Sequence, residues 1–189
     1  MASENKVLFN IQNTHYAPLT VVEGVPNWGT PVHVPGTVSL LLDAQSTVEP
    51  FYADGIAYYR SVSNNGYTGN LEMARFSDQM LIDIWKFILN DTDKVLMESA
   101  YKNPQEFALL FQIDGDADKE YYCLYNVTGT KPAVGASTST ESKTPQTKTS
   151  AISAAPLQGG LVMARTTAQT PADIKTGWFK SVYFKTNSD

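Results

Sequence analysis

Few residues in this sequence have the type and spacing that catalysis requires. The two histidines, His15 and His33, lie in a proline-rich region, and the single cysteine, Cys123, lies in an aromatic segment much further along. A nucleophilic thiolate–imidazole pair would have to bring Cys123 beside a histidine, and no local motif supports that. Phosphate-binding loops, G-x-S-x-G elbows and H-E-x-x-H pairs are missing. We therefore expect no catalytic residues and no cofactor.

One acidic run imitates the start of a calcium-binding loop. Asp114, Asp116 and Asp118 occupy its first, third and fifth positions. The sixth position needs glycine for a sharp turn but holds Lys119, and the twelfth needs a bidentate glutamate but holds Tyr125. The run also joins two predicted strands instead of two helices. It therefore predicts a polar hairpin turn and no metal site.

Aromatic residues are numerous, with ten Tyr, eight Phe and three Trp. Exposed Trp28, Trp178 or paired tyrosines would form a platform on which sugar rings stack. Sheet cores and subunit interfaces use aromatic side chains equally well. Both interpretations stay open at this point.

Composition and charge narrow the class of protein. The 189 residues support a single domain (1–189), and the apolar content of 42% is ordinary for a globular protein. The net charge is −5 and the basic residues form no cluster, which argues against tight nucleic-acid binding. The N-terminus lacks the features of a signal peptide, and no apolar run approaches 18 residues. We expect a product made in the cytoplasm, without a membrane partner.

Hydrophobic alternation, rich in β-branched and aromatic residues, predicts a mainly β chain. Three segments lack this pattern: a proline-rich N-terminal arm over about residues 1–36, a loop over 44–55, and a flexible Ser/Thr-rich loop over 135–148. The Asn-Asn-Gly run at 64–66 predicts a turn. The predicted strands cover residues 6–12, 37–43, 56–62, 68–76, 95–101, 106–113, 120–128, 149–155, 161–166 and 178–184.

One segment has a convincing helical period. Ser77 is a good N-cap, Asp78 complements the positive helix end, and the apolar stripe continues for about 12 residues. Many strands around one helix favour an antiparallel β-sandwich or barrel with a flanking α-helix and long extended loops or arms. We expect five stripe residues to pack on the sheet: Met80, Leu81, Ile84, Trp85 and Ile88.

Several short motifs follow one another between about residue 36 and residue 184. They are Glu-Pro-Phe-Tyr-Ala-Asp-Gly at 49–55 with Ala-Tyr-Tyr at 57–59, Asn-Gly-Tyr-x-Gly-Asn-Leu-Glu at 65–72, Phe-Ala-Leu-Leu-Phe at 107–111 with Asp-Gly-Asp at 114–116, Leu-Tyr-Asn-Val-Thr at 124–128, and Trp-Phe-x-x-Val-Tyr at 178–183. As an ordered set they resemble the major tail tube proteins of long, non-contractile-tailed (siphovirus-type) bacteriophages of Gram-positive bacteria. Members often carry an additional immunoglobulin-like decoration domain at the C-terminus, which we expect this chain to lack.

The resemblance implies the tail-tube fold and a structural, non-enzymatic role. Six copies would form a ring, and rings would stack into a tube around the tape-measure protein, ending at the tail terminator and distal tail proteins. Genome DNA would later pass through the lumen without specific binding. Six copies at −5 each carry −30, and an acidic lumen repels phosphate, which lets DNA slide. The implied location is the virion tail, after assembly in the host cytoplasm.

By the same resemblance, the 44–55 loop is the candidate for stacking one ring on the next, with Phe51 and Tyr52 as anchors. Its alternative role is to cap one end of the sandwich. The N-terminal arm is a second candidate for reaching a neighbour. Two other functions stay open: the inner tube subunit of a contractile tail or injection system, and a carbohydrate-binding β-sandwich module. The full candidate set for self-assembly is Val48, Glu49, Pro50, Phe51, Tyr52, Ala53 and Asp54.

Overall fold

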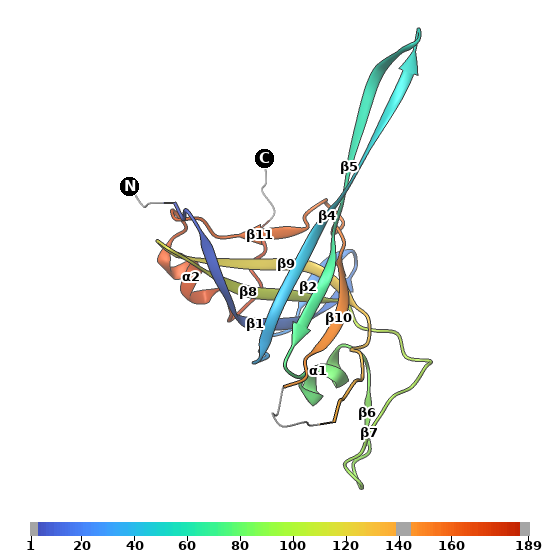
Figure 1. The fold of residues 1–189 in the computed structure, drawn as a ribbon, viewed down its shortest axis with the longest axis vertical. Helices are drawn as coiled ribbons and strands as arrows, with labels where there is room; N and C mark the ends of the chain where they lie inside the picture. Colours follow the sequence, from blue (N-terminus) through green and yellow to red (C-terminus); the bar gives the residue numbers. More distant parts are fainter. Residues whose placement is uncertain (1–3, 139–144, 186–189) are drawn as a thin grey trace.

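The computed structural model describes residues 4–138 and 145–185, which are mainly antiparallel strands (Figure 1). Strands hold 51% of the residues and helices 7%, which confirms the predicted mainly β class. Within the described residues, nine strands form the main sheet in the order β2-β1-β8-β9-β10-β5-β4, with β3 beside β1 and β11 beside β9. Its strands are β1 (Leu8–Val22), β2 (Val25–Trp28), β3 (Val32–His33), β4 (Thr37–Ala53), β5 (Ile56–Met73), β8 (Phe107–Gly115), β9 (Lys119–Gly129), β10 (Lys148–Ala154) and β11 (Met163–Arg165).

The main sheet bends around an apolar core to which both ends of its strand order contribute. Tyr16 of β1 and Leu71 of β5 are buried in this core, and Leu40 of β4 packs against it. Strands β1, β8 and β9 cross the steeper strands β4, β5 and β10 (Figure 1). The two halves of the sheet therefore enclose the core between them, and helix α1 (Asp78–Asp83) adds Met80 from below.

Helix α1 is shorter than predicted. Ser77 is its N-cap, as expected, and accepts a 3.2 Å hydrogen bond from the backbone N–H of Met80. The helix ends after six residues, and Lys86 then adopts a positive φ of 56°, which a helix cannot continue through. The stripe prediction is confirmed for Met80, Ile84 and Trp85, which are buried, and for Leu81, which packs against the core; it is wrong for Ile88, which lies in strand β6 and is exposed.

A second apolar core covers the other face of β1, β8 and β9. Leu110 and Cys123 point into it, and it is closed by α2 (Ala172–Gly177) and the segment that follows α2. The predictions of a single helix and of a strand over 178–184 are therefore wrong. The aromatic residues there do suit a strand, but they pack flat against the sheet: the Trp178 indole donates to the Tyr122 carbonyl at 3.2 Å, and the Tyr125 hydroxyl donates to the Tyr183 carbonyl at 2.9 Å.

The prediction of an irregular N-terminal arm is also wrong. Residues of this region form β1, β2 and β3, and β1 pairs with β8 over most of its length. Proline does not prevent this, because Pro26 lies on the edge strand β2, a position where proline is tolerated, while Pro31 and Pro35 lie between strands. Pro18 lies within β1 opposite Phe107, just before the pairing with β2 begins at Leu19, and its carbonyl accepts a hydrogen bond from the Gly29 N–H at 2.9 Å.

Other strand predictions are confirmed with shifted ends. The expected strands at 106–113, 120–128, 149–155 and 161–166 correspond to β8, β9, β10 and β11, whereas 95–101 contains only the two residues of β7 (Leu96–Met97). That strand pairs with β6 (Ile88–Leu89) in a small separate hairpin. The Ser/Thr-rich loop at 135–148 lies partly outside the described residues, and its described part is irregular up to β10. No helix in residues 4–138 or 145–185 is long and apolar enough to cross a bilayer.

Candidate assembly interface

The segment predicted to be a loop at 44–55 is the outer part of a long β-hairpin. Strands β4 and β5 pair from their bases to Ala53 and Ile56, so the loop prediction is wrong. Strand β10 pairs with β5 only from Tyr67 to Met73. Beyond that point the two strands continue alone and project from the body (Figure 1). We call residues 46–64 the distal hairpin; strand β4 extends roughly 30 Å past the last three-stranded pairing, which is at Ala44 opposite Tyr67.

A two-residue turn closes the distal hairpin. Ala53 pairs with Ile56, and the residues between them, Asp54 and Gly55, have φ values of 54° and 77°. Positive φ at both positions is the requirement of the type I′ turn, whose twist matches that of the flanking strands, and Asp-Gly is a preferred sequence for it. The Asp-Gly pair was therefore the sequence signal that distinguishes a hairpin from a loop here.

A glycine marks the base of the distal hairpin. The register of β4 and β5 shifts between Ala44 and Ser46, opposite Gly66, whose φ is 90°. A Cβ at Gly66 would collide with the carbonyl oxygen of Ala154, at the end of β10. The predicted turn at 64–66 is therefore a bulge within one continuous strand, and bulges increase local twist and bend the strand. The hairpin departs from the sheet at this bulge.

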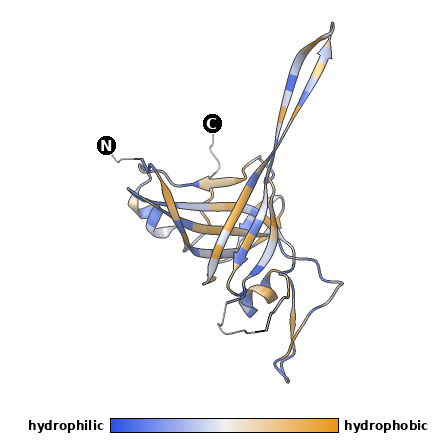
Figure 2. Cartoon of the chain, in the orientation of Figure 1, coloured by the Kyte–Doolittle hydropathy of each residue, from blue (hydrophilic) through white to orange (hydrophobic). Residues whose placement is uncertain are grey.

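The distal hairpin is apolar and exposed on both faces. Phe51 lies opposite Tyr59, and Val48 lies opposite Val62. Figure 2 shows hydrophobic bands alternating with neutral and hydrophilic ones along the projecting hairpin. Of the predicted residues, Val48 to Ala53 lie on β4 and Asp54 lies in the turn, so the structure brings all seven together. Sequence reasoning missed the matching residues of β5, which only the pairing reveals: Ile56, Tyr58, Tyr59 and Val62.

The exposed aromatic area is large for a single hairpin. Phe51, Tyr52, Tyr58 and Tyr59 are 62–71% exposed. With roughly 150–250 Å² for each fully exposed aromatic side chain, these four present about 500 Å². A stable protein interface buries about 800 Å² on each partner. An isolated two-stranded hairpin is also only marginally stable in water. Both arguments make the distal hairpin a candidate contact surface.

Strand β4 has a second feature suited to assembly. Within the described residues it pairs only with β5, so its other edge carries unpaired N–H and C=O groups along its length. Such an edge is a template for pairing with another chain. An apolar groove of about 510 Å³ adjoins this edge, between Val38 and Leu40 of β4 and Phe9 and Ile11 of β1.

The residues considered for nucleophilic catalysis do not form a reactive pair. His15 lies opposite Leu110, and Leu110 lies opposite Cys123 on the next strand, which places the histidine and cysteine backbones two strand spacings, about 10 Å, apart. Burial raises the pKa of the Cys123 thiol, the opposite of what an activated nucleophile needs. His15 instead contacts His33 and stacks on Phe179, with ring centroids 4.9 and 4.5 Å apart.

The acidic run forms the β8–β9 turn, as predicted. Its carboxylates are occupied by protein donors: Asp114 accepts from Gln12 and Gln112, Asp116 accepts from the Lys6 N–H, and Asp118 pairs with Lys175. Within residues 4–138 and 145–185, no group of three His, Cys, Asp or Glu residues could hold a metal ion.

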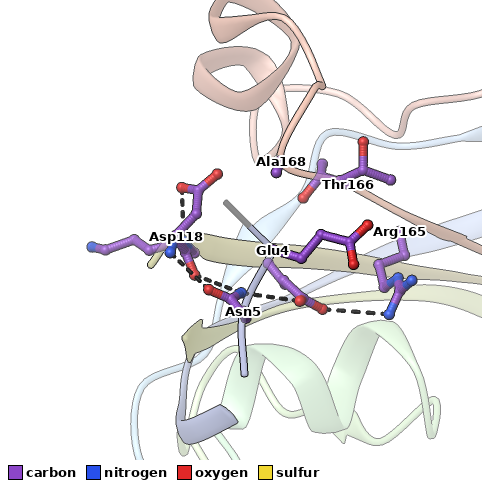
Figure 3. A pocket seen from close by; sticks show the side chains of 9 residues that line it. Glu4, Asn5, Asp118, Arg165, Thr166 and Ala168 are labelled. Carbon is purple, nitrogen blue, oxygen red and sulfur yellow. Dashed lines mark hydrogen bonds and ion pairs between the residues drawn. The ribbon is translucent and has the colours of Figure 1, made fainter. Parts of the chain in front are cut away.

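A small polar pocket of about 190 Å³ lies beside this turn (Figure 3). Asn5 reaches across it, donating to the Asp118 carbonyl at 2.9 Å and to a Glu120 carboxylate oxygen at 3.0 Å. Glu120 also pairs with Arg165 at 3.6 Å. Hydrogen bonds and ion pairs between these lining groups join the N-terminal segment to β9 and β11, which favours a structural role for this pocket.

Comparison with known proteins adds no further constraint. No protein-family model matches this sequence, and no curated protein matches it significantly. The functional interpretation therefore depends on the residues and surfaces described above.

Proposed function

We propose that this protein is a structural subunit that polymerises, and specifically the major tail tube protein of a siphovirus-type bacteriophage. Copies would associate as hexameric rings, and stacked rings would form the tube that surrounds the tape-measure protein and conducts genome DNA. The tail-tube form of the β-sandwich is part of this proposal, as is the absence of enzymatic activity.

The observation that carries the proposal is the projecting distal hairpin. Its seven large apolar side chains are 56–71% exposed on an element that has no third strand to support it. A monomeric protein rarely maintains such a surface, whereas an apolar patch of this size is typical of an interaction site. The exposed side chains are Val48, Phe51, Tyr52, Ile56, Tyr58, Tyr59 and Val62.

The free edge of β4 supplies a second kind of contact. Edge pairing between neighbours is directional, and a head-to-tail interface of this type closes into a ring when the rotation between copies allows it. A ring with hairpins projecting from one side would leave those hairpins for the next ring. Two distinct contacts of this kind are what a tube of stacked rings requires.

The net charge of the chain agrees with a tube whose lumen conducts DNA without binding it. The net charge of −5 does not favour the binding of phosphate groups. We place the assembled protein in the virion tail, with the tape-measure, tail terminator and distal tail proteins as its other partners, and its assembly in the host cytoplasm.

Electron microscopy of the purified protein over a concentration series tests the proposal. We expect rings or striated hollow tubes for the natural sequence. A variant with Phe51→Ser and Tyr52→Ser should retain its circular dichroism spectrum but form no tubes. Val22→Ser, which changes an equally exposed valine at the β1–β2 hairpin, is the matched control and should assemble normally. A natural chain that remains monomeric at the highest concentration would contradict the proposal.

One alternative from a different class has an observation in its favour. Exposed Tyr52, Tyr58 and Tyr59 could stack on sugar rings. Aliphatic Val48, Ile56 and Val62 lie among them, however, which favours a protein partner. Binding on a glycan array by a chain that does not assemble would support the carbohydrate-binding alternative.

A further inference from the structure

A second exposed hairpin lies at the opposite end of the molecule from the distal hairpin. Strands β6 and β7 pair through Ile88 with Met97 and Leu89 with Leu96, and we call residues 88–97 the lower arm. Along the longest axis in Figure 1, the distal hairpin reaches one extreme and the lower arm reaches the other. The two projections therefore cannot meet within one copy, but they face each other between copies stacked in the same orientation.

Hydrogen bonds shape the turn of the lower arm and hold its base. The Asn90 side-chain oxygen accepts hydrogen bonds from the N–H groups of Thr92 and Asp93 at 2.9 and 3.0 Å, which shapes its turn. At its base, Lys131 donates to a Glu98 carboxylate oxygen at 2.6 Å and to the Ser99 carbonyl at 3.3 Å. These contacts shape the turn of the arm and tie its base to Lys131, which follows β9.

The apolar side chains of the lower arm are only about half covered by residues 4–138 and 145–185. Ile88, Leu89, Val95 and Met97 are 41–54% exposed on a ladder only two pairs long. Tyr101, just past the arm, is 97% exposed. The core that accounts for Ile84 and Trp85 ends before this point. An exposed apolar hairpin with so few internal pairs needs an external contact, just as the distal hairpin does.

We infer that the lower arm is the surface that receives the distal hairpin of the next copy. The inference rests on the proposed function and names the partner surface for ring-to-ring stacking. The distal hairpin offers most of the roughly 800 Å² that one side of a stable interface buries, and the lower arm is the exposed apolar surface at the opposite end of the chain. Because the two surfaces differ and lie at opposite ends, the contact is head-to-tail and repeats indefinitely along the axis.

A complementation experiment tests this pairing. The tip variant, Phe51→Ser with Tyr52→Ser, has an intact arm, and the arm variant, Ile88→Ser with Met97→Ser, has an intact tip. Neither should form tubes alone. Mixed in equal amounts they can form one junction and no more, so light scattering should show species of twice the mass of either variant. Tubes of normal length from the arm variant alone, or no doubled species in the mixture, would overturn the inference.

Cross-linking gives a second readout that does not depend on loss of assembly. Cys123 is the only cysteine and is fully buried, so introduced cysteines are the only accessible thiols. Tyr58→Cys tested with Ile88→Cys, Val95→Cys and Met97→Cys under mild oxidation should yield a disulfide-linked dimer with at least one arm position. Tyr58→Cys with Val22→Cys is the control and should yield none. If disulfide bonds form only between the Tyr58→Cys positions of two copies, the contact is instead between two hairpin tips.

The outcomes separate this inference from the function on which it rests. Natural tubes together with an arm variant that assembles normally would overturn the arm contact and leave the tail-tube proposal standing. A natural chain that never assembles would contradict both.

Discussion

The hydroxyl of Tyr16 donates a 2.7 Å hydrogen bond to a carboxylate oxygen of Asp83, and this bond fixes the end of helix α1 against strand β1. The two residues are 67 positions apart, and Tyr16 is fully buried. Burial first, and then the bond to Asp83, raise the pKa of the Tyr16 phenol, so it remains a donor at any physiological pH. The contact ties the helix to the opposite side of the first core.

Replacing Tyr16 with Phe should lower the free energy of unfolding by about 1.5–3 kcal/mol, the usual contribution of a hydrogen bond to a charged group. The ring itself would still fill its place in the core. Urea denaturation measures the change. Tyr58→Phe, on the exposed hairpin, is the control and should leave the free energy of unfolding unaltered; equal losses from both variants would show that the Tyr16–Asp83 bond contributes nothing specific.

Stability should fall as pH drops below about 6.5 because of His15. Burial lowers the pKa of this imidazole from its ordinary 6.5, and neighbouring His33 adds to the lowering, while the hydrogen bond to the Asn13 carbonyl opposes it. Below pH 6.5 the unfolded chain therefore binds a proton at His15 before the folded chain does, which favours unfolding. We expect the natural chain to lose more stability between pH 7.5 and 5.5 than His15→Gln does. If the natural chain and His15→Gln lose the same free energy of unfolding over this pH range, His15 does not cause the loss.

Two glycines with similar backbone angles should respond differently to alanine. Gly66 and Gly55 have φ values of 90° and 77°, so alanine strains the backbone at both, at a cost of about 1–3 kcal/mol. At Gly66 the added Cβ also meets the carbonyl of Ala154, whereas nothing lies within 4 Å at Gly55. Gly66→Ala should therefore lower the melting temperature clearly more than Gly55→Ala. Equal decreases in melting temperature for the two variants would mean that the strands around Gly66 move to accommodate the added Cβ without a measurable loss of stability.

The thiol of Cys123 should be unreactive in the folded protein. It is fully buried, and burial raises its pKa, so almost no thiolate exists at neutral pH. We expect a colorimetric thiol reagent to label the chain in strong denaturant and to leave the native protein unlabelled for hours. Rapid labelling without denaturant would reveal that the second core opens readily.

The sequence predicted best those elements whose pattern is local. Phe107, Leu109 and Phe111 alternate on one face of β8 and do pack into the first core, and Ser77 caps α1 as expected. Residues with a similar pattern were misassigned where tertiary packing decided the outcome. Ile88 continues the helical stripe in sequence, yet it lies beyond the point where Lys86 takes a positive φ and the chain leaves the helix.

The residues of the candidate interface were proposed from the sequence, but the shape of their segment was not predicted. Phe51 and Tyr52 were proposed as stacking anchors on the basis of a resemblance, within a segment expected to be a loop, and the structure places both on an exposed hairpin. The register that pairs Phe51 with Tyr59 is set by the two-residue turn at Asp54 and Gly55 and by a register shift between Phe51 and Tyr52. Neither feature belongs to the hydrophobic period from which the strands were predicted, so the β5 half of the surface escaped prediction.

Strand β4 is continuous from the first core to the hairpin turn, and this has a mechanical consequence. Leu40 and Leu42 pack against the core, while Val48 and Phe51, on the same strand, are exposed far from it. A pull at the turn would move β4 and β5 together, so the load would fall in shear on the ladder that joins β5 to β10, whose hydrogen bonds lie across the direction of force. An axial load applied at the tip would therefore pass directly into the most buried part of the protein.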